Sequence, residues 1–147
     1  MSERENKAII RRLLEEVWSH GDLAAADEIV DANMVDHVTR PGDPIGLEGL
    51  KQSVTMFRIA FPDLEITSDD QIAEGDKVAV LWTARGTHLG ELMGIAPTGS
   101  RIEVRGMYLY RLANGKLVER AGARDMLALM QQIGAIPARK WSKGAAS

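Results

Sequence analysis

The spacing of the apolar residues changes at Pro62, and this change limits the fold more than any other feature of the sequence. Before Pro62 the apolar residues recur every three or four positions over 3–19, 23–30 and 47–61, as on one face of a helix. After Pro62 they alternate over 64–69, 77–88, 101–112 and 116–124, as in half-buried strands. A short helical pattern follows over 126–133. Three helices, a four-stranded meander and a last short helix predict an α+β fold.

Turn residues mark the ends of these segments. Gly21 is placed to close the first helix, and Asp22 is placed to cap the second. The segment 34–38 is expected to be extended, and the prolines and glycine of 40–44 predict a loop. Asn114-Gly115 is a hairpin turn signal between the last two strands. A strongly curved sheet over one long helix would leave a closed-ended pocket, which is a natural site for a small molecule.

Composition excludes several classes of function. The 147 residues, 45% hydrophobic and 27% charged, predict one folded domain over 1–147 with a frayed tail after Pro137. The chain has no cysteine, which excludes disulfides, thiolate metal sites and a cysteine nucleophile. The net charge of -3 and the scattered basic residues disfavour nucleic acid as a partner. No segment approaches the ~20 apolar residues of a membrane span, so we expect no membrane partner and a cytoplasmic location.

Only three histidines are present, which leaves few candidates for imidazole chemistry. His20 adjoins the Gly21 turn, where we expect it to be solvent-exposed. His37 and His88 follow at separations of 17 and 51 residues, which match no compact metal-ligand motif, so no metal site is predicted.

Several short stretches together resemble one protein family. They are Val35-Asp36-His37, Gly46-Leu47-Glu48-Gly49, Ala60-Phe61-Pro62-Asp63-Leu64, Gly75-Asp76-Lys77-Val78, Gly86-Thr87-His88-Leu89-Gly90, Ala96-Pro97-Thr98-Gly99, Asn114-Gly115-Lys116-Leu117-Val118-Glu119 and Asp125. In this order and spacing they cover about residues 5–134 and are similar to the SnoaL-like polyketide cyclase family, within the nuclear-transport-factor-2-like superfamily. The resemblance implies a conical α+β barrel, a homodimer, no cofactor, and ring closure by intramolecular aldol chemistry with an aspartate as acid and base.

Asp125 matches the acid/base aspartate of that family. Strand alternation would place Ala121, Ala123 and Asp125 on one face, giving an apolar lining with one acid at its end. An aspartate directly before the helical pattern of 126–133 is equally suited to capping that helix. The sequence leaves both roles open.

The resemblance also places His37 and His88 at positions that face the cavity, where imidazole could polarise a carbonyl or hold a hydroxyl. Alternation puts Trp82 and His88 on one wall, although a histidine at a strand end can equally bond to the backbone. We predict that the substrate contacts Trp82, Tyr108, Ala121 and Phe57. Tyr108 and Tyr110 are also possible hydroxyl donors, although either could instead pack in the core. Arg120 and Ala121 stand where many relatives carry a His-Trp pair, and Arg120 and Arg124 could each pair with Asp125.

Three functions are compatible with these residues. The first is a cofactor-free cyclase acting on a hydrophobic, carbonyl-bearing small molecule, with Asp125 as base and His88 and His37 orienting oxygens. The second is a protein of the same fold that binds such a molecule without transforming it. The third is an epoxide hydrolase or isomerase relative, as in other branches of the superfamily.

Overall fold

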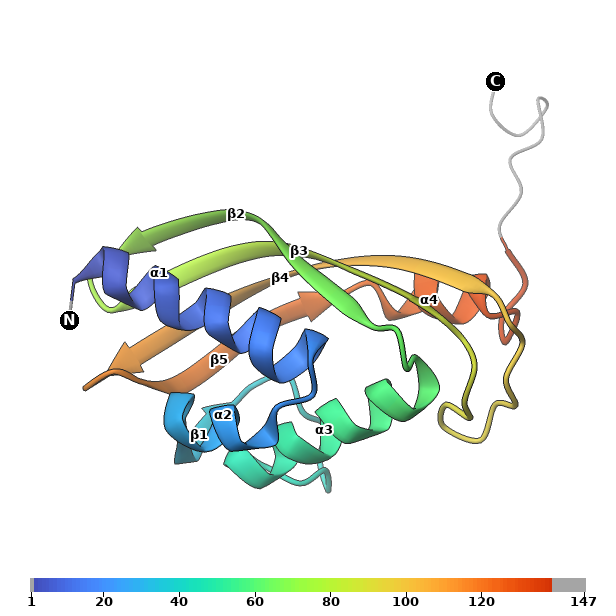
Figure 1. Cartoon of the computed structure of the whole chain (residues 1–147), viewed down its shortest axis with the longest axis horizontal. Helices are drawn as coiled ribbons and strands as arrows, with labels where there is room; N and C mark the ends of the chain where they lie inside the picture. Colours follow the sequence, from blue (N-terminus) through green and yellow to red (C-terminus); the bar gives the residue numbers. More distant parts are fainter. Residues whose placement is uncertain (1, 139–147) are drawn as a thin grey trace.

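The fold is built on a long curled sheet (Figure 1). The structure is a computed structural model, which describes residues 2–138. The strands are β1 (Val30–Asp36), β2 (Glu65–Glu74), β3 (Lys77–Thr87), β4 (Arg101–Ala113) and β5 (Lys116–Arg124). The helices are α1 (Glu3–Arg12), which continues as a π-helical segment (Leu13–Ser19), α2 (Leu23–Ile29), α3 (Gly46–Ala60) and α4 (Met126–Gln132). The predicted α+β class is confirmed.

The sheet has the order β1-β5-β4-β3-β2. Strands β2 to β5 form the predicted antiparallel meander. The prediction of four strands is wrong in one respect, because β1 adds a fifth strand that pairs in parallel with β5. Its register places Asp36 beside Arg120, 84 positions further along the chain. A pairing over that separation leaves no local sequence pattern, whereas a hairpin does.

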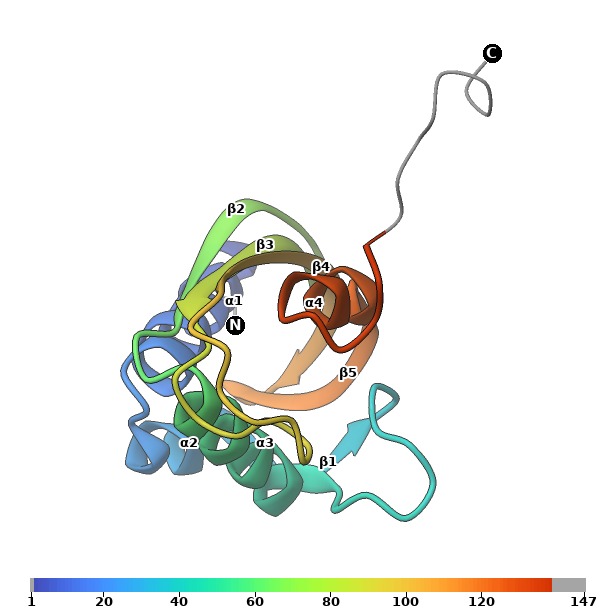
Figure 2. The same cartoon turned by 90° about the vertical axis from the view of Figure 1, so that its right-hand side faces the viewer.

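The sheet curls around an interior that the helices close. In the end-on view of Figure 2, β2 to β5 wrap around this interior, α1 and α3 lie along its open side, and α4 lies at one end. The residues of β3 that face inward are buried, as the alternation predicts: Val78, Val80, Trp82 and Ala84. The apolar face of the sheet and the apolar faces of the helices therefore form one core.

Arg58 of α3 fixes the end of the π-helical segment. Its Nη1 donates hydrogen bonds to the carbonyl oxygens of Trp18 (3.0 Å), Ser19 (2.7 Å) and Leu64 (3.2 Å), and its Nη2 donates to that of Pro62 (3.1 Å). A cation at this position satisfies carbonyl groups that the helix itself leaves without donors. One side chain thus ties α3 to the first helix and to the start of β2.

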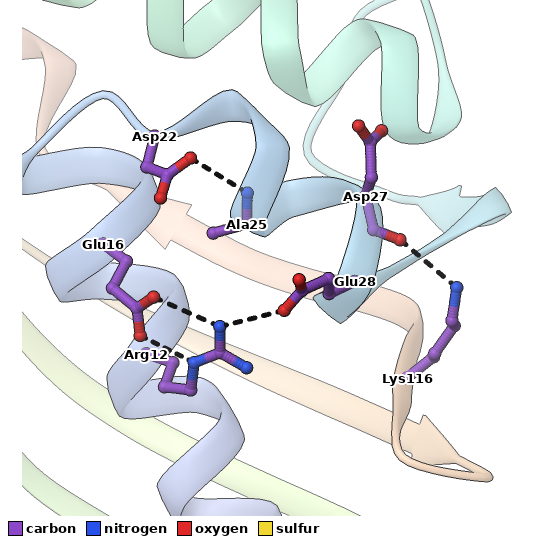
Figure 3. A network of polar contacts seen from close by, with 7 residues as sticks. All are labelled: Arg12, Glu16, Asp22, Ala25, Asp27, Glu28 and Lys116. Carbon is purple, nitrogen blue, oxygen red and sulfur yellow. Dashed lines mark hydrogen bonds and ion pairs between the residues drawn. The ribbon is translucent and has the colours of Figure 1, made fainter.

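Polar contacts join the first two helices and β5 on the outside of the molecule (Figure 3). Arg12 bridges Glu16 at 2.6 Å and Glu28 at 3.2 Å. Asp22 accepts a hydrogen bond from the Ala25 amide at 3.1 Å, which confirms the predicted cap of α2. Ion pairs this exposed add little stability, so this network fixes geometry more than it stabilises the fold.

Within residues 2–138, no helix is long and apolar enough to cross a membrane. The tail that was predicted to fray after Pro137 lies, from residue 139 onward, outside the described residues.

Candidate functional site

An apolar cavity of about 60 Å³ lies between the concave face of the sheet and the helices. It is lined by Leu14, Trp18, Phe57, Phe61, Leu64, Ile66, Trp82, Ala84, Ile102, Val104, Tyr108, Tyr110, Arg124, Met126 and Leu129. No carboxylate or imidazole is among these lining residues. The lining residues with polar side-chain groups are Trp18 and Trp82 (indole N–H), Tyr108 and Tyr110 (hydroxyl) and Arg124 (guanidinium). The lining suits an apolar molecule that carries a few hydrogen-bond acceptors.

Two glycines let aromatic rings lie flat on the inner face of the sheet. Gly106 is opposite Trp82 in the register, and a Cβ there would come within 2.1 Å of Trp82 Cζ2. Gly122 is opposite Tyr108, and a Cβ there would come within 2.2 Å of the Met107 carbonyl oxygen. The Trp82 and Tyr108 rings lie 5.4 Å apart between centroids. Only glycine at 106 and 122 allows this pair of rings to form a wall of the cavity.

The helices supply the opposite wall and one end. Leu14 and Trp18 come from the π-helical segment, four positions apart, and the Trp18 ring lies 6.3 Å from that of Phe57 on α3. A π-helical turn is wider than an α-helical turn, and such turns are often found at functional sites. At the end of the cavity, the side-chain amide of Gln132 bonds to the backbone N–H and C=O of Glu103 at 2.7 and 2.9 Å. These bonds hold α4 against β4.

Aromatic side chains carry most of the hydrogen-bonding groups of the cavity. The Trp82 Nε1–H is buried and has no acceptor among the described residues. Tyr108 and Tyr110 meet edge to face, with 6.0 Å between ring centroids. Burial raises the pKa of Tyr110 far above its ordinary value, so its hydroxyl stays protonated. These groups can donate hydrogen bonds to a ligand carbonyl.

A buried ion pair lies behind the tyrosines. Arg120 donates from Nη2 and Nε to the two carboxylate oxygens of Asp36, at 2.6 and 3.2 Å. The Arg120 and Asp36 side chains are only 5% and 1% exposed. The guanidinium also lies 5.2 Å from the Tyr108 ring centroid. The sequence suggested Asp125 as a partner of Arg120, which is wrong, because the parallel pairing of β1 brings Asp36 beside it.

Arg124 borders both the apolar cavity and a second, more polar hollow of about 410 Å³. The hollow is lined by Val38, Thr39, Arg40, Asp43, Pro44, Gly49, Gln52, Ser53, Met56, Met93, Arg120 and Arg124. The Arg124 guanidinium lies 5.1 Å from the centroid of the Phe57 ring. Within residues 2–138, no carboxylate lies within 4.0 Å of it. Arg124 therefore presents an unneutralised charge where the cavity meets the hollow.

Three of the four predicted substrate contacts line the cavity, namely Trp82, Tyr108 and Phe57. The fourth, Ala121, does not. It pairs with Leu109, which is 45% exposed on the outer face of the sheet. Alternation counted from the buried Leu117 predicts inward side chains at 119, 121, 123 and 125. An irregularity in the β4–β5 register after Leu117 reverses that order, so the inward positions are 120, 122 and 124.

Asp125 lies outside the cavity lining. It is exposed, and its carboxylate accepts a hydrogen bond from the Ala128 amide at 3.0 Å, as the N-cap of α4. Of the two roles that the sequence left open, the capping contact is present in the structure. Asp125 directly follows Arg124 and precedes Met126, which both line the cavity.

The two predicted histidines lie apart from each other and from Asp125. His88 is fully buried against Phe61, and its Nδ1 accepts from the Thr98 amide at 3.2 Å and lies 2.9 Å from the Thr98 hydroxyl. His37 is exposed, with its Nε2 2.8 Å from a carboxylate oxygen of Glu119. Neither ring is part of the cavity lining. His88 joins the two ends of the loop 88–100, and His37 contacts Glu119 on the surface.

The described part of the chain contains no group of three or more His, Asp or Glu side chains that could hold a metal ion. The sequence offers Tyr108 and Tyr110 as possible hydroxyl donors, and both line the cavity. It gives Asp36 no role at the site and names Arg124 only as a possible partner of Asp125. The positions of Asp36 and Arg124 could not be predicted, since they depend on the parallel pairing of β1 and on the irregularity in β5.

Comparison with known proteins gives a consistent result. The family model described as SnoaL-like polyketide cyclase matches residues 8–133. No curated protein sequence matches the chain. Among solved structures, IdmH, a candidate polyketide cyclase from Streptomyces antibioticus, is 31% identical with a TM-score of 0.78, over 88% of this chain and 98% of that one. A candidate SnoaL-like polyketide cyclase from Jannaschia sp. CCS1 is 27% identical with a TM-score of 0.80, over 92% and 95%. TsrD from Streptomyces laurentii, at 24% identity, shares the fold with a TM-score of 0.84 over 92% and 99%.

Proposed function

Because the chain belongs to the SnoaL-like polyketide cyclase family, we propose that its cavity binds an apolar, carbonyl-bearing small molecule and promotes ring closure without a cofactor. The family and its structures support a cyclase-type role. The observation that carries the proposal is the cavity itself, which lies between the curled sheet and the helices and is lined by apolar side chains with few hydrogen-bond donors. Such a cavity holds a flexible chain in a folded shape and excludes water from the reacting carbons.

The proposed chemistry is an intramolecular aldol reaction. A base removes a proton from a carbon next to one carbonyl, and the resulting enolate carbon attacks a second carbonyl of the same molecule. A carbon–carbon bond forms, and the new alkoxide takes a proton. Tyr108 and Tyr110 are suited to polarise the attacked carbonyl and to stabilise the alkoxide, because both residues line the cavity and each carries a hydroxyl donor. The raised pKa of Tyr110 favours this donor role over a role as base.

Asp125 is the proposed proton acceptor. It is the carboxylate that the chain places between two lining residues, Arg124 and Met126. Its carboxylate would have to leave the Ala128 amide and turn inward, so the proposal requires the first turn of α4 to open when substrate binds. His88 would act only by positioning the loop 88–100, and His37 would take no part in the chemistry.

A second candidate function is binding without transformation. It is favoured by the lack of any carboxylate or imidazole among the residues that line the cavity. In that case the protein would hold or carry the small molecule, and the Asp125 carboxylate would only cap α4.

A cavity-filling variant tests both candidates. Ala84 lines the cavity and is 8% exposed, so Ala84→Leu would fill much of the space. Ala79 lies on the same strand with its side chain on the other face, and Ala79→Leu is the matched control. The test compound is a linear diketone whose carbonyls are separated by three methylene groups. The expected product is the isomeric methyl-substituted hydroxycyclohexanone, or the methyl-substituted cyclohexenone that forms from it by loss of water.

The cyclase proposal predicts that the wild type and Ala79→Leu both form the cyclic product and that Ala84→Leu does not, as measured by mass spectrometry. The binding function would be favoured if the wild type binds the diketone saturably, Ala84→Leu abolishes that binding, and no product forms faster than in buffer alone. If turnover or binding of the diketone survives in Ala84→Leu, the cavity is not the site of either candidate function.

We also propose that the protein forms a homodimer through the outer face of the sheet. Apolar side chains are exposed there side by side: Met107 is 55% exposed, Leu109 45% and Leu81 36%. Ala121 and Ala123 lie next to them on β5. An apolar area of this kind favours a second copy of the chain. Leu109→Glu is expected to convert a dimer to a monomer in analytical ultracentrifugation, and a monomeric wild type at micromolar concentration would contradict the proposal.

A further inference from the structure

Among residues 2–138, Arg124 is the one basic side chain that borders both the apolar cavity and the polar hollow. Its guanidinium is half-buried, and its position is set by the aromatic ring of Phe57, 5.1 Å away. A guanidinium beside an apolar cavity, without a carboxylate partner among the described residues, loses part of its hydration and gains no ion pair in return. An anionic group of a ligand would supply that partner.

The other charges of the hollow largely cancel. Arg120 is paired with Asp36, with both side chains buried. Arg40 and Asp43 both line the hollow, and the Asp43 carboxylate also accepts a hydrogen bond from the Arg40 amide at 2.9 Å. Arg124 therefore remains as the charge that a bound anion would meet at the junction.

We infer that Arg124 selects ligands that carry a carboxylate at one end, with the apolar body in the cavity and the carboxylate in the hollow. This inference rests on the proposed function and adds a ligand class to it. A single guanidinium offers two parallel N–H donors, which match the two oxygens of a carboxylate. Arg40 also lines the hollow but does not line the cavity, so within the described residues Arg124 is the basic side chain that stands at the junction of the two.

The test uses phenylacetate and its neutral isostere phenylacetamide. The two share the apolar ring and differ in one charged group. Binding is followed by protein-observed NMR, with the Trp82 indole resonance as the reporter for the cavity. The wild type is expected to bind phenylacetate about tenfold more tightly than phenylacetamide, as for a charge-assisted hydrogen bond in a partly buried site.

Arg124→Met removes the charge and keeps the length of the side chain. It is expected to weaken binding of phenylacetate to the level of phenylacetamide and to leave phenylacetamide unchanged. Arg124→Lys is expected to retain part of the preference. Arg105→Met is the matched control, because Arg105 is exposed on β4, one position from Gly106, which pairs with Arg124. The control should keep the full preference.

Four results would overturn the inference. The first is equal affinity of the wild type for the two compounds, and the second is a preference for phenylacetate that persists in Arg124→Met. Either result leaves the proposed function intact if Ala84→Leu still abolishes binding. A preference lost equally in Arg105→Met would show general attraction by surface charge instead of a site at Arg124. If neither compound shifts the Trp82 resonance, the inference is wrong, while the proposed function is decided separately by the diketone assay with Ala84→Leu.

Discussion

Arg120 and Arg124 lie four positions apart on the same inner face of β5, yet their surroundings are opposite. Arg120 is almost fully buried and bonds to both carboxylate oxygens of Asp36. Arg124 is half-buried, lies over Phe57 and has no carboxylate partner in the described part of the chain. The same residue type therefore serves the fold at one position and is available to a ligand at the other.

The end of β1 explains the difference. The edge strand runs beside β5 only as far as Asp36, which is in register with Arg120. Beyond that point the chain leaves the sheet as the loop 37–45, so no acidic strand residue stands beside Arg124. The hollow begins where this strand pairing stops. A short edge strand thus decides which arginine is neutralised and which is not.

Removing the Arg120 guanidinium should have the largest effect on stability. Arg120→Met leaves the Asp36 carboxylate buried and unpaired, and breaking a buried pair in this way costs about 3–5 kcal/mol. The loss is measured as the free energy of unfolding in urea. The double variant Asp36→Asn/Arg120→Met removes both charges and keeps an acceptor for the Val38 amide, so it should lose less than the single variant. A double variant that is less stable than Arg120→Met would contradict this account of the pair.

The local features of the fold were open to prediction from the sequence. The Asp22 cap depends on residues within three positions of it, and the Asn114-Gly115 turn joins neighbouring strands, so short-range rules were sufficient. The inward face of β3, with Val80 and Trp82, followed from simple alternation because β3 and β4 pair without interruption. The same alternation placed His88 on the wall of Trp82, but His88 lies beyond the end of β3 and outside the cavity lining.

The site was less predictable, for two physical reasons. The Asp36–Arg120 pair joins residues 84 positions apart, and a parallel edge strand has no sequence signature. The irregularity near Leu117 reverses the faces of β5, which moved Ala121 outward and Arg124 inward. The family resemblance named Asp125, which directly follows β5. The sequence did not reveal which positions of β5 face the cavity, so it could not show where Asp125 lies.

Gly122 lies between the two arginines, and a side chain there should disturb the wall that they share. Its φ of 147° is unfavourable for other residues, and a Cβ would lie 2.5 Å from Tyr108 Cδ1. Gly122→Ala is expected to cost about 1–3 kcal/mol of unfolding free energy, from backbone strain and overpacking. Near-ultraviolet circular dichroism should report the displaced Tyr108 ring. An unchanged spectrum with unchanged stability would show that the ring does not depend on Gly122.

Asp125 gives a smaller effect that separates a structural from a chemical role next to Arg124. Asp125→Ala removes the acceptor of the Ala128 amide and should cost about 1 kcal/mol, the usual value of an N-cap. Asp125→Asn keeps a good cap and removes the charge, so its unfolding free energy should stay close to that of the wild type. If turnover of the diketone falls in both variants, Asp125 acts as the base. Full turnover in Asp125→Asn would leave it only the capping role.

Arg124→Met should have the smallest effect on stability of the four. The lost cation–π contact with Phe57 is worth about 0.5–1 kcal/mol at a partly exposed site, and the methionine side chain keeps part of the packing. The unfolding free energy should therefore fall by less than about 1 kcal/mol, although this variant is the one expected to abolish the preference for phenylacetate. Stability and selectivity would then be divided between two arginines of one strand. A loss as large as that of Arg120→Met would instead show that Arg124 is held by the fold as firmly as Arg120, and its charge could no longer be assigned to a ligand.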